Sequence, residues 1–194
     1  MKVEIMQATP NPLDLISLAA GCCYGKDDIS HKRAKRCIRQ GHTSVAEHAV
    51  ITFKVEGISR ACLAQLTRHR IGVSFSVMSQ RYCKIDVDSN DWYVKPESFG
   101  DWFDEKMHND GLAYLDALDA DVKAEDARFL LPEATKTNLF ITMNARALIH
   151  FLKLRSDPAA QWEIRELANE MRMEASVFNQ WRELINCGLA NCED

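Results

Sequence analysis

No stretch of this sequence approaches the roughly 20 consecutive apolar residues that a membrane-spanning helix needs. An excess of positive charge is also missing, since 24 Lys and Arg stand against 28 Asp and Glu, giving a net charge of -4. General binders of nucleic acid or anionic membranes are usually basic, so neither class is favoured. Residues 1–8 carry Lys2 and Glu4 among apolar side chains, which indicates a strand and not a secretory signal.

The seven cysteines contain no C-x-x-C pair, which leaves a zinc ribbon or a thioredoxin-like centre without support. Their number is odd and their spacings are irregular. Because residues 1–8 do not read as a secretory signal, we expect reduced thiols in a cytoplasmic protein. Cys187 and Cys192 could pair on oxidation, but we expect free thiols in a frayed terminus.

Several motifs of common enzyme classes are absent: G-x-G-x-x-G, the P-loop and G-x-S-x-G. Their absence disfavours a classical dinucleotide fold, a P-loop phosphotransferase and a serine hydrolase. His42 and His48 lie six positions apart, a spacing that puts the imidazoles on different faces of a regular helix. No metal site is therefore predicted.

The length of 194 residues suits one domain with a sizeable core, which we expect to span residues 1–194. The patterning predicts strands over residues 1–8, 49–55 and 138–143, an extended segment over 73–82, and a surface loop over 84–100. It predicts helices over residues 12–21, 31–40, 59–68, 101–127, 144–154 and 158–185. Ser44 and Glu47 fit a capping box that begins a short helix. Strands and helices without strict βαβ alternation indicate an α+β fold.

Positive charge is concentrated in Arg68-His69-Arg70, and Arg81 follows eleven positions after Arg70 with Ser79 and Gln80 beside it. Guanidinium forks match phosphate oxygens, and Ser and Gln add neutral donors and acceptors. This pattern predicts a site for a phosphorylated, nucleotide-like small molecule. The alternative is a solvated charged face, because cations are favoured at a helix C-terminus without any ligand. The basic residues within 31–39 fit a solvated helix face better than a nucleic-acid contact.

Four sequence blocks, in order along the chain, resemble those of the flavin-dependent thymidylate synthases. They are His42-Thr43-Ser44-Val45-Ala46-Glu47-His48, Arg68-His69-Arg70 with Ser79-Gln80-Arg81-Tyr82, Ala127-Arg128-x-x-Leu131-Pro132, and Asn144-Ala145-Arg146 with Phe151-Leu152-Lys153-Leu154-Arg155. The common form of the family signature has seven residues between Arg-His-Arg and Ser, whereas this chain has eight.

The resemblance implies a twisted, mostly antiparallel sheet flanked by helices, in a homotetramer whose active sites lie at subunit contacts. It implies conversion of dUMP to dTMP with 5,10-methylenetetrahydrofolate as the carbon donor. FAD, reduced by NADPH, would supply the hydride. The expected partners are these small molecules and further copies of the chain, without nucleic acid or membrane.

The resemblance also assigns roles by position. The positions that match dUMP-binding residues are Gln65, Arg68, Ser79, Gln80, Arg81, Arg128 and Arg155. Arg155 matches the residue that stabilises the uracil anion at N3, a role suited to a permanent cation. Ser79, the other candidate catalytic residue, is expected to hydrogen-bond the substrate. Covalent attack by Ser79 is disfavoured because no activating base is visible beside it.

The positions that match flavin-contacting residues are Ser44, Glu47, Arg68, His69, Arg70, Asn144, Ala145, Arg146 and His150. His42 and Glu125 match polar positions around the active site. Val77 and Met78 stand where many relatives carry polar groups. These departures keep open a related enzyme that modifies dCMP or adds a hydroxymethyl group. A non-catalytic nucleotide-binding protein is the alternative from a different class.

Overall fold

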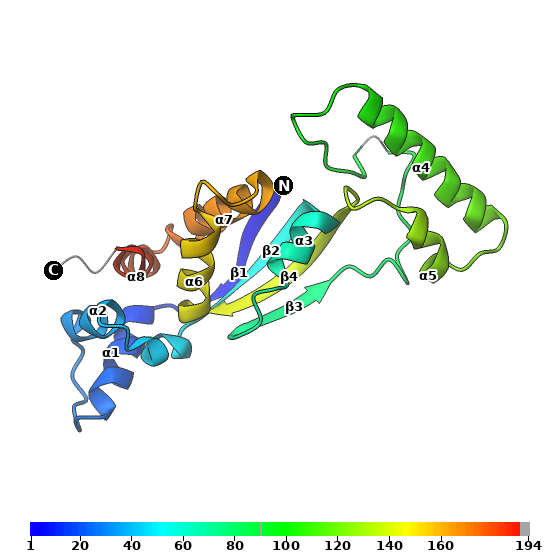
Figure 1. The fold of residues 1–194 in the computed structure, drawn as a ribbon. Coiled ribbons are helices and arrows are strands. Elements are labelled where there is room, and N and C mark those ends of the chain that lie inside the picture. Colours follow the sequence, from blue (N-terminus) through cyan, green and yellow to red (C-terminus); the bar gives the residue numbers. More distant parts are fainter. Residues whose placement is uncertain (90, 191–194) are drawn as a thin grey trace.

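The strands form one antiparallel sheet in the order β1-β2-β4-β3, seen in a computed structural model that describes residues 1–89 and 91–190 (Figure 1). The strands are β1 (Lys2–Ala8), β2 (Val50–Ser59), β3 (Val73–Val77) and β4 (Lys136–Asn144). Phe53 of β2 lies opposite Ile5 of β1 and Ile141 of β4, and Ile141 lies opposite Phe75 of β3. The expected α+β fold with a mostly antiparallel sheet is confirmed.

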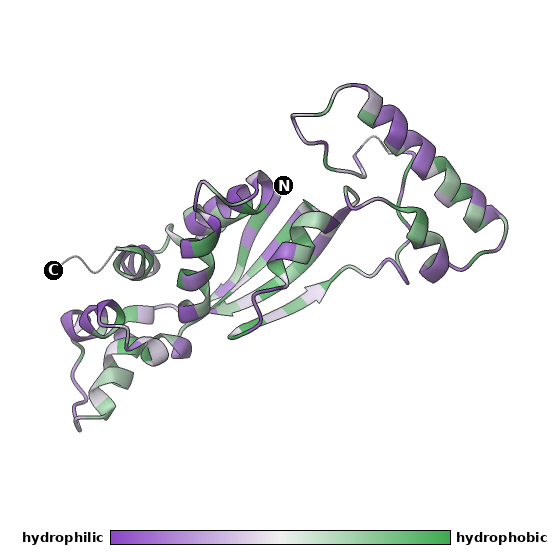
Figure 2. Ribbon diagram, viewed as in Figure 1, coloured by the Kyte–Doolittle hydropathy of each residue, from purple (hydrophilic) through white to green (hydrophobic). Residues whose placement is uncertain are grey.

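Helices cover one face of this sheet and bury the main hydrophobic core. Alternate residues along each strand are buried, as the two-residue period of a strand requires; in β4 they are Leu139, Ile141 and Met143. The covering helices are α1 (Pro12–Cys22), α2 (His31–Arg39), α6 (Ala145–Arg155), α7 (Trp162–Ala175) and α8 (Asn179–Leu189). The short α3 (Arg60–Leu66) follows β2 and contributes Cys62 and Leu66 to the same core. Hydrophobic residues alternate with polar ones along the strands in Figure 2.

A second hydrophobic cluster lies in the lobe that projects from the end of the sheet (Figure 1). This lobe contains α4 (Trp102–Asp119), α5 (Ala124–Ala127) and the 3-10 helix η2 (Arg128–Leu130). The single helical stretch predicted over residues 101–127 is wrong, because the chain turns at Asp121, whose φ is 61°. The surface loop predicted over residues 84–100 lies only partly at the surface, because Ile85 and Trp92 are buried in this cluster.

Further local predictions differ from the structure. Residues Thr43–His48 form the 3-10 helix η1, whose N-cap is His42 without a side-chain hydrogen bond, so the predicted capping box at Ser44 is wrong. The extended segment predicted over residues 73–82 ends at Val77, and Ser79 begins a turn in which its carbonyl accepts from the amides of Tyr82 and Cys83. The helix predicted over residues 59–68 is α3, which ends at Leu66. The single helix predicted over residues 158–185 is wrong, because the chain forms two helices there, α7 and α8.

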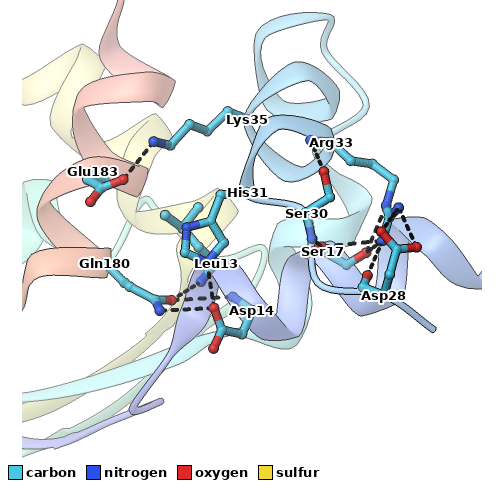
Figure 3. A network of polar contacts seen from close by, with 10 residues as sticks. All are labelled: Leu13, Asp14, Ser17, Asp28, Ser30, His31, Arg33, Lys35, Gln180 and Glu183. Carbon is cyan, nitrogen blue, oxygen red and sulfur yellow. Dashed lines mark hydrogen bonds and ion pairs between the residues drawn. The ribbon is translucent and has the colours of Figure 1, made fainter. Parts of the chain in front are cut away.

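A polar network fastens α8 to the N-terminal helices (Figure 3). Asp14 Oδ1 accepts from His31 Nε2 at 2.5 Å and from Gln180 Nε2 at 3.0 Å, and the hydrogen bond from His31 is the main reason that the Asp14 pKa lies below its usual value. Gln180 Oε1 accepts from the backbone amide of Leu13 at 2.9 Å. Lys35 pairs with Glu183 at 2.6 Å.

This network bears on the basic residues within 31–39. Lys35 pairs with Glu183 as above, and Arg33 pairs with Asp28 at 3.2 Å, so both cations are engaged within the chain. The observation favours a structural helix face over a nucleic-acid contact.

Cys187 is buried in α8, so the frayed terminus expected there is wrong for this residue, and Cys192 lies outside the described residues. Within the described residues, no helix is both long and apolar enough to cross a bilayer. The same residues contain no group of three or more His, Cys, Asp or Glu side chains that could hold a metal ion.

Candidate active site

The start of α6 is fixed by Asn144 and by a close approach of Gly72. Asn144 Oδ1 accepts from the amide of Ala147 at 2.9 Å and so caps the helix, while the Asn144 amide donates to the Gly72 carbonyl at 3.0 Å. Gly72 has a φ of 70°, and a Cβ there would lie 2.4 Å from Asn144 Nδ2. Only glycine therefore lets the segment after Arg68-His69-Arg70 pack against the end of α6 that carries Arg146.

The first pocket, here called the His69 pocket, lies between this segment and α6 and has a volume of about 350 Å³. It is lined by Arg68, His69, Arg70, Ile71, Val73, Ala147, His150, Leu154 and Arg155. Arg155 Nε donates to His69 Nε2 at 3.0 Å. Burial, followed by the positive charge of Arg155 and by His150, lowers the His69 pKa to about 4. The structure thus brings both arginines of the triplet together with Arg155, although these residues lie far apart in the sequence.

The second pocket, here called the Arg128 pocket, lies between α3 and the projecting lobe and has a volume of about 330 Å³. It is lined by Arg60, Gln80, Arg128, Phe129, Leu131, Pro132 and Glu133. Glu125 organises its border, because its carboxylate pairs with Arg81 Nε at 2.6 Å and its carbonyl accepts from Arg128 Nε at 2.9 Å. Glu125 thus orients both Arg81 and Arg128, two arginines that the sequence assigned to dUMP binding.

Arg60 in the Arg128 pocket is a candidate that the sequence reasoning missed. Its Nη2 donates to the Met78 carbonyl at 2.9 Å, but its Nε is buried without a hydrogen-bond partner among the described residues. Burial, followed by repulsion from the nearby Arg128, lowers the Arg60 pKa. An unpaired buried donor beside a second cation fits an anionic ligand. The sequence carried one indication of this role: α3 contains no acidic residue that could pair with Arg60.

Among the described residues, no side chain bonds to the Ser79 hydroxyl in a way that would activate it as a nucleophile. Its Oγ accepts from the amide of Arg81 at 3.2 Å, an arrangement that holds the turn. Among the described contacts, no carboxylate or imidazole bonds to this hydroxyl. This geometry gives no support to nucleophilic attack, and the substrate-binding role of Ser79 stays a prediction.

The remaining positions assigned to the flavin lie at η1 and at the start of α6. Glu47 of η1 pairs with Arg146 of α6 at 2.5 Å, and both side chains are about half exposed. Ser44 is exposed in η1, the same 3-10 helix as Glu47. The Ala145 methyl group is buried and its amide donates to the Ala49 carbonyl at 2.8 Å, so Ala145 joins η1 to α6 through its backbone.

The dUMP-assigned positions do not form one cavity within the chain. Arg68 and Arg155 line the His69 pocket, whereas Gln80 and Arg128 line the Arg128 pocket, and Gln65 lines neither. The departures Val77 and Met78 are partly buried, packing against the main core and the second cluster respectively. They therefore join the two lobes and have a structural reason to be apolar.

The residues present fit FAD in chemical kind. Ile71 and Val73 give the His69 pocket an apolar wall for a ring system, and exposed Arg68 and Arg70 provide cations for a diphosphate. The volume of the pocket suits a drug-sized molecule, and FAD is larger, so one chain encloses only a part of it.

Comparisons with known proteins address the family of this chain. Residues 4–177 match the family model described as thymidylate synthase complementing protein. The flavin-dependent thymidylate synthase of Geobacter sulfurreducens is 43% identical over 187 residues, which cover 88% of this chain and 80% of that protein. The enzyme of the same name from Thermococcus onnurineus is 38% identical over 206 residues, covering 95% and 82%.

Solved structures give the same result. Thymidylate synthase X from Helicobacter pylori, crystallised with FAD and dUMP, superposes with a TM-score of 0.81 at 27% identity and covers 98% of this chain and 100% of that chain. The UMP/dUMP methylase PolB from Streptomyces cacaoi, bound to 5-Br dUMP, superposes with a TM-score of 0.77 at 26% identity and covers 98% and 96%. On the family model, the sequence identity and the shared fold, this chain belongs to the family of flavin-dependent thymidylate synthases.

Proposed function

We propose that the chain catalyses the reductive methylation of dUMP to dTMP with 5,10-methylenetetrahydrofolate as the carbon donor. FAD, reduced by NADPH, supplies the hydride when bound. The observation that carries this function is the meeting of Arg155 with Arg68 and Arg70 in the His69 pocket. A module that only bound phosphate would not need a half-buried arginine in the same pocket as two exposed ones.

The phosphate of dUMP would lie against the cations of the Arg128 pocket. Arg60 offers an unpaired Nε, Arg128 lies close to it, and Gln80 adds a neutral amide. Arg81 is oriented by Glu125 at the border of this pocket. A dianionic phosphate would relieve the repulsion between the two guanidinium groups.

The uracil ring would lie against Arg155. Its guanidinium keeps a positive charge at every working pH and stabilises negative charge that develops at uracil N3. Ser79 would hydrogen-bond the substrate without forming a covalent bond. Ser44, the Glu47–Arg146 pair and the start of α6 would hold the cofactor, along with Arg68, His69, Arg70 and His150.

The division of the dUMP positions between two pockets supports a homotetramer whose sites are shared between copies. Mixing Arg155→Lys chains with Arg128→Met chains, each nearly inactive alone, is expected to restore part of the activity after subunit exchange. Assays before and after exchange, with chromatography and light scattering for the oligomeric state, measure this. A monomer, or no recovery in exchanged tetramers, would contradict shared sites.

A cytoplasmic location is part of the proposal. It is supported by the described cysteines, of which Cys22, Cys23, Cys37, Cys62, Cys83 and Cys187 are all free thiols.

Arg60→Met is expected to weaken dUMP binding about tenfold, because a hydrogen-bonded charge on the phosphate is lost while the length of the side chain is kept. Deoxyuridine, which lacks the phosphate, should bind the variant and the wild type equally. Calorimetric titration with both ligands checks this. Arg172→Met, at an exposed position of α7, is the control, and an equal loss for both ligands would refute a phosphate contact.

Ser79→Ala is expected to lower kcat/KM for dUMP by up to about tenfold, the usual effect of losing one neutral hydrogen bond. Steady-state kinetics measure the change, with Ser76→Ala on the exposed side of β3 as the control. Complete loss of turnover with dUMP still bound would instead support a covalent role for Ser79.

The function itself is tested by the visible spectrum of the purified protein before and after dUMP is added. A flavin spectrum that dUMP perturbs is expected, because cofactor and substrate share one site. Product analysis should then detect dTMP only when FAD, a reductant and methylenetetrahydrofolate are all present. Formation of dTMP without flavin would overturn the proposal. Mass analysis of reactions with dUMP, UMP and dCMP distinguishes the substrates, UMP being included because one structural relative is a UMP/dUMP methylase.

A further inference from the structure

Arg155 is held differently from other paired arginines of the chain. Arg33, Arg81 and Arg146 are each paired with a carboxylate, at 3.2, 2.6 and 2.5 Å. Among the described residues, the Arg155 side chain makes its hydrogen bond to an imidazole nitrogen, His69 Nε2. Arginine can only donate hydrogen bonds, so His69 Nε2 must be the acceptor and carry no proton.

We propose that His69 is the positioning residue for Arg155, fixing the guanidinium through Nε while leaving its Nη groups and its full charge for the substrate. This inference rests on the proposed function, in which Arg155 stabilises the uracil anion. It gives His69 a role distinct from the flavin contact that the family resemblance implies.

A neutral acceptor suits this task better than a carboxylate. A carboxylate at hydrogen-bond distance would fix the same nitrogen but would neutralise most of the guanidinium charge that the substrate is to meet. The imidazole orients a long, flexible side chain, whose freedom would otherwise be lost on substrate binding, without adding a negative charge. The planar guanidinium then presents its Nη edge in one direction.

The imidazole ring is itself held by α6. Phe151, one turn before Arg155 on the same helix, meets the His69 ring edge to face at 5.1 Å between centroids. The His150 ring lies 6.0 Å away at 63°. Burial, followed by the positive charge of Arg155 and by the neighbouring His150, lowers the His69 pKa to about 4. The acceptor is therefore present throughout neutral pH and is lost only as the pH falls through about 4.

Variants of His69 in the FAD-loaded enzyme test the acceptor. His69→Gln keeps a neutral oxygen near the position of Nε2 and should retain kcat within about threefold, whereas His69→Leu should lose about 10- to 100-fold, as expected for a hydrogen bond to a charged group. His69→Glu keeps an acceptor but adds a charge, and its kcat should fall as far as that of the Leu variant. Flavin absorbance and thermal melting check cofactor content and folding of each variant.

The kinetic outcomes separate positioning from flavin contact. If His69 acts through Arg155, His69→Leu added to Arg155→Lys should lower kcat no further. Equal losses in the Gln and Leu variants, a Glu variant as active as the wild type, or additive losses in the double variant would each overturn the proposal.

Nitrogen NMR of the six histidines gives a readout that needs no turnover. The His69 ring, assigned by its absence from the Gln variant, should remain neutral from pH 5.5 to 8 with the proton on Nδ1. A proton on Nε2, or titration near the ordinary histidine pKa of about 6.5, would overturn the proposal. If the NMR result holds but no chain makes dTMP, the proposed function fails while the His69–Arg155 contact stands.

Discussion

Arg155→Lys is expected to lower kcat for dTMP formation by about 100- to 1,000-fold, the usual effect of removing one donor aimed at developing negative charge. Lysine keeps a positive charge but lacks the planar fork, and its single ammonium cannot bond to His69 Nε2 and meet the uracil edge in the same geometry. FAD should remain bound, because the exposed cations Arg68 and Arg70 are unchanged. Single-turnover kinetics of the reduced enzyme with dUMP and methylenetetrahydrofolate measure the chemical step.

The control for this substitution is Arg172→Lys, an Arg-to-Lys change at an exposed position of α7. It should leave kcat within error, because Arg172 lies outside both pockets. An Arg155→Lys enzyme that turns over at the wild-type rate would remove Arg155 from the mechanism. A variant without FAD would instead place the residue among the cofactor contacts.

Local patterns predicted most of the elements that form the sheet and its covering helices, except that the one helix predicted over residues 158–185 is two helices, α7 and α8. The alternation in β2 and β4 and the apolar stripe of α6 depend on neighbouring residues, so the sequence carries them directly. The break after α4 was not predictable in this way. Asp121 adopts a left-handed conformation, and no Gly or Pro at this position indicates the turn in the sequence. The burial of Trp92 likewise depends on contacts within a cluster that includes Phe103 and Met107.

In the site, too, the sequence predicted local features but not contacts between distant segments. The ordered sequence blocks named Arg68, Arg128 and Arg155, but their spacing did not indicate that Arg128 and Arg155 lie in different pockets. Arg60 was missed because two features mark it only in the folded chain: its buried Nε has no acceptor among the described residues, and Arg128 of the other lobe lies close to it. The bond between His69 and Arg155 joins two blocks that the sequence separates by 86 positions. Such contacts between distant segments follow from the tertiary fold.

Glu163→Ala is expected to lower the free energy of unfolding by about 3 kcal/mol, because two buried donors would lose a charged acceptor. Glu163 is 2% exposed on α7, and its carboxylate accepts from the Ser59 amide at 2.7 Å and from the Ser59 hydroxyl at 2.5 Å. The Ser59 hydroxyl in turn accepts from the Cys62 amide at 2.9 Å and caps α3. Substitution therefore leaves both Ser59 donors unpaired in the core and loosens the helix cap.

Thermal and urea unfolding measure this loss, and a change of about 3 kcal/mol corresponds to a Tm lower by roughly 6–12 °C for a domain of this size. Glu166→Ala, one turn along the same helix at an exposed position, is the matched control and should change Tm little. A Glu163→Ala protein as stable as this control would mean that water replaces the carboxylate. Because α3 leads from Arg60 through Gln65 to Arg68, the variant should also bind dUMP more weakly at temperatures where it remains folded. An unchanged affinity would mean that the cap stabilises the fold without positioning the site.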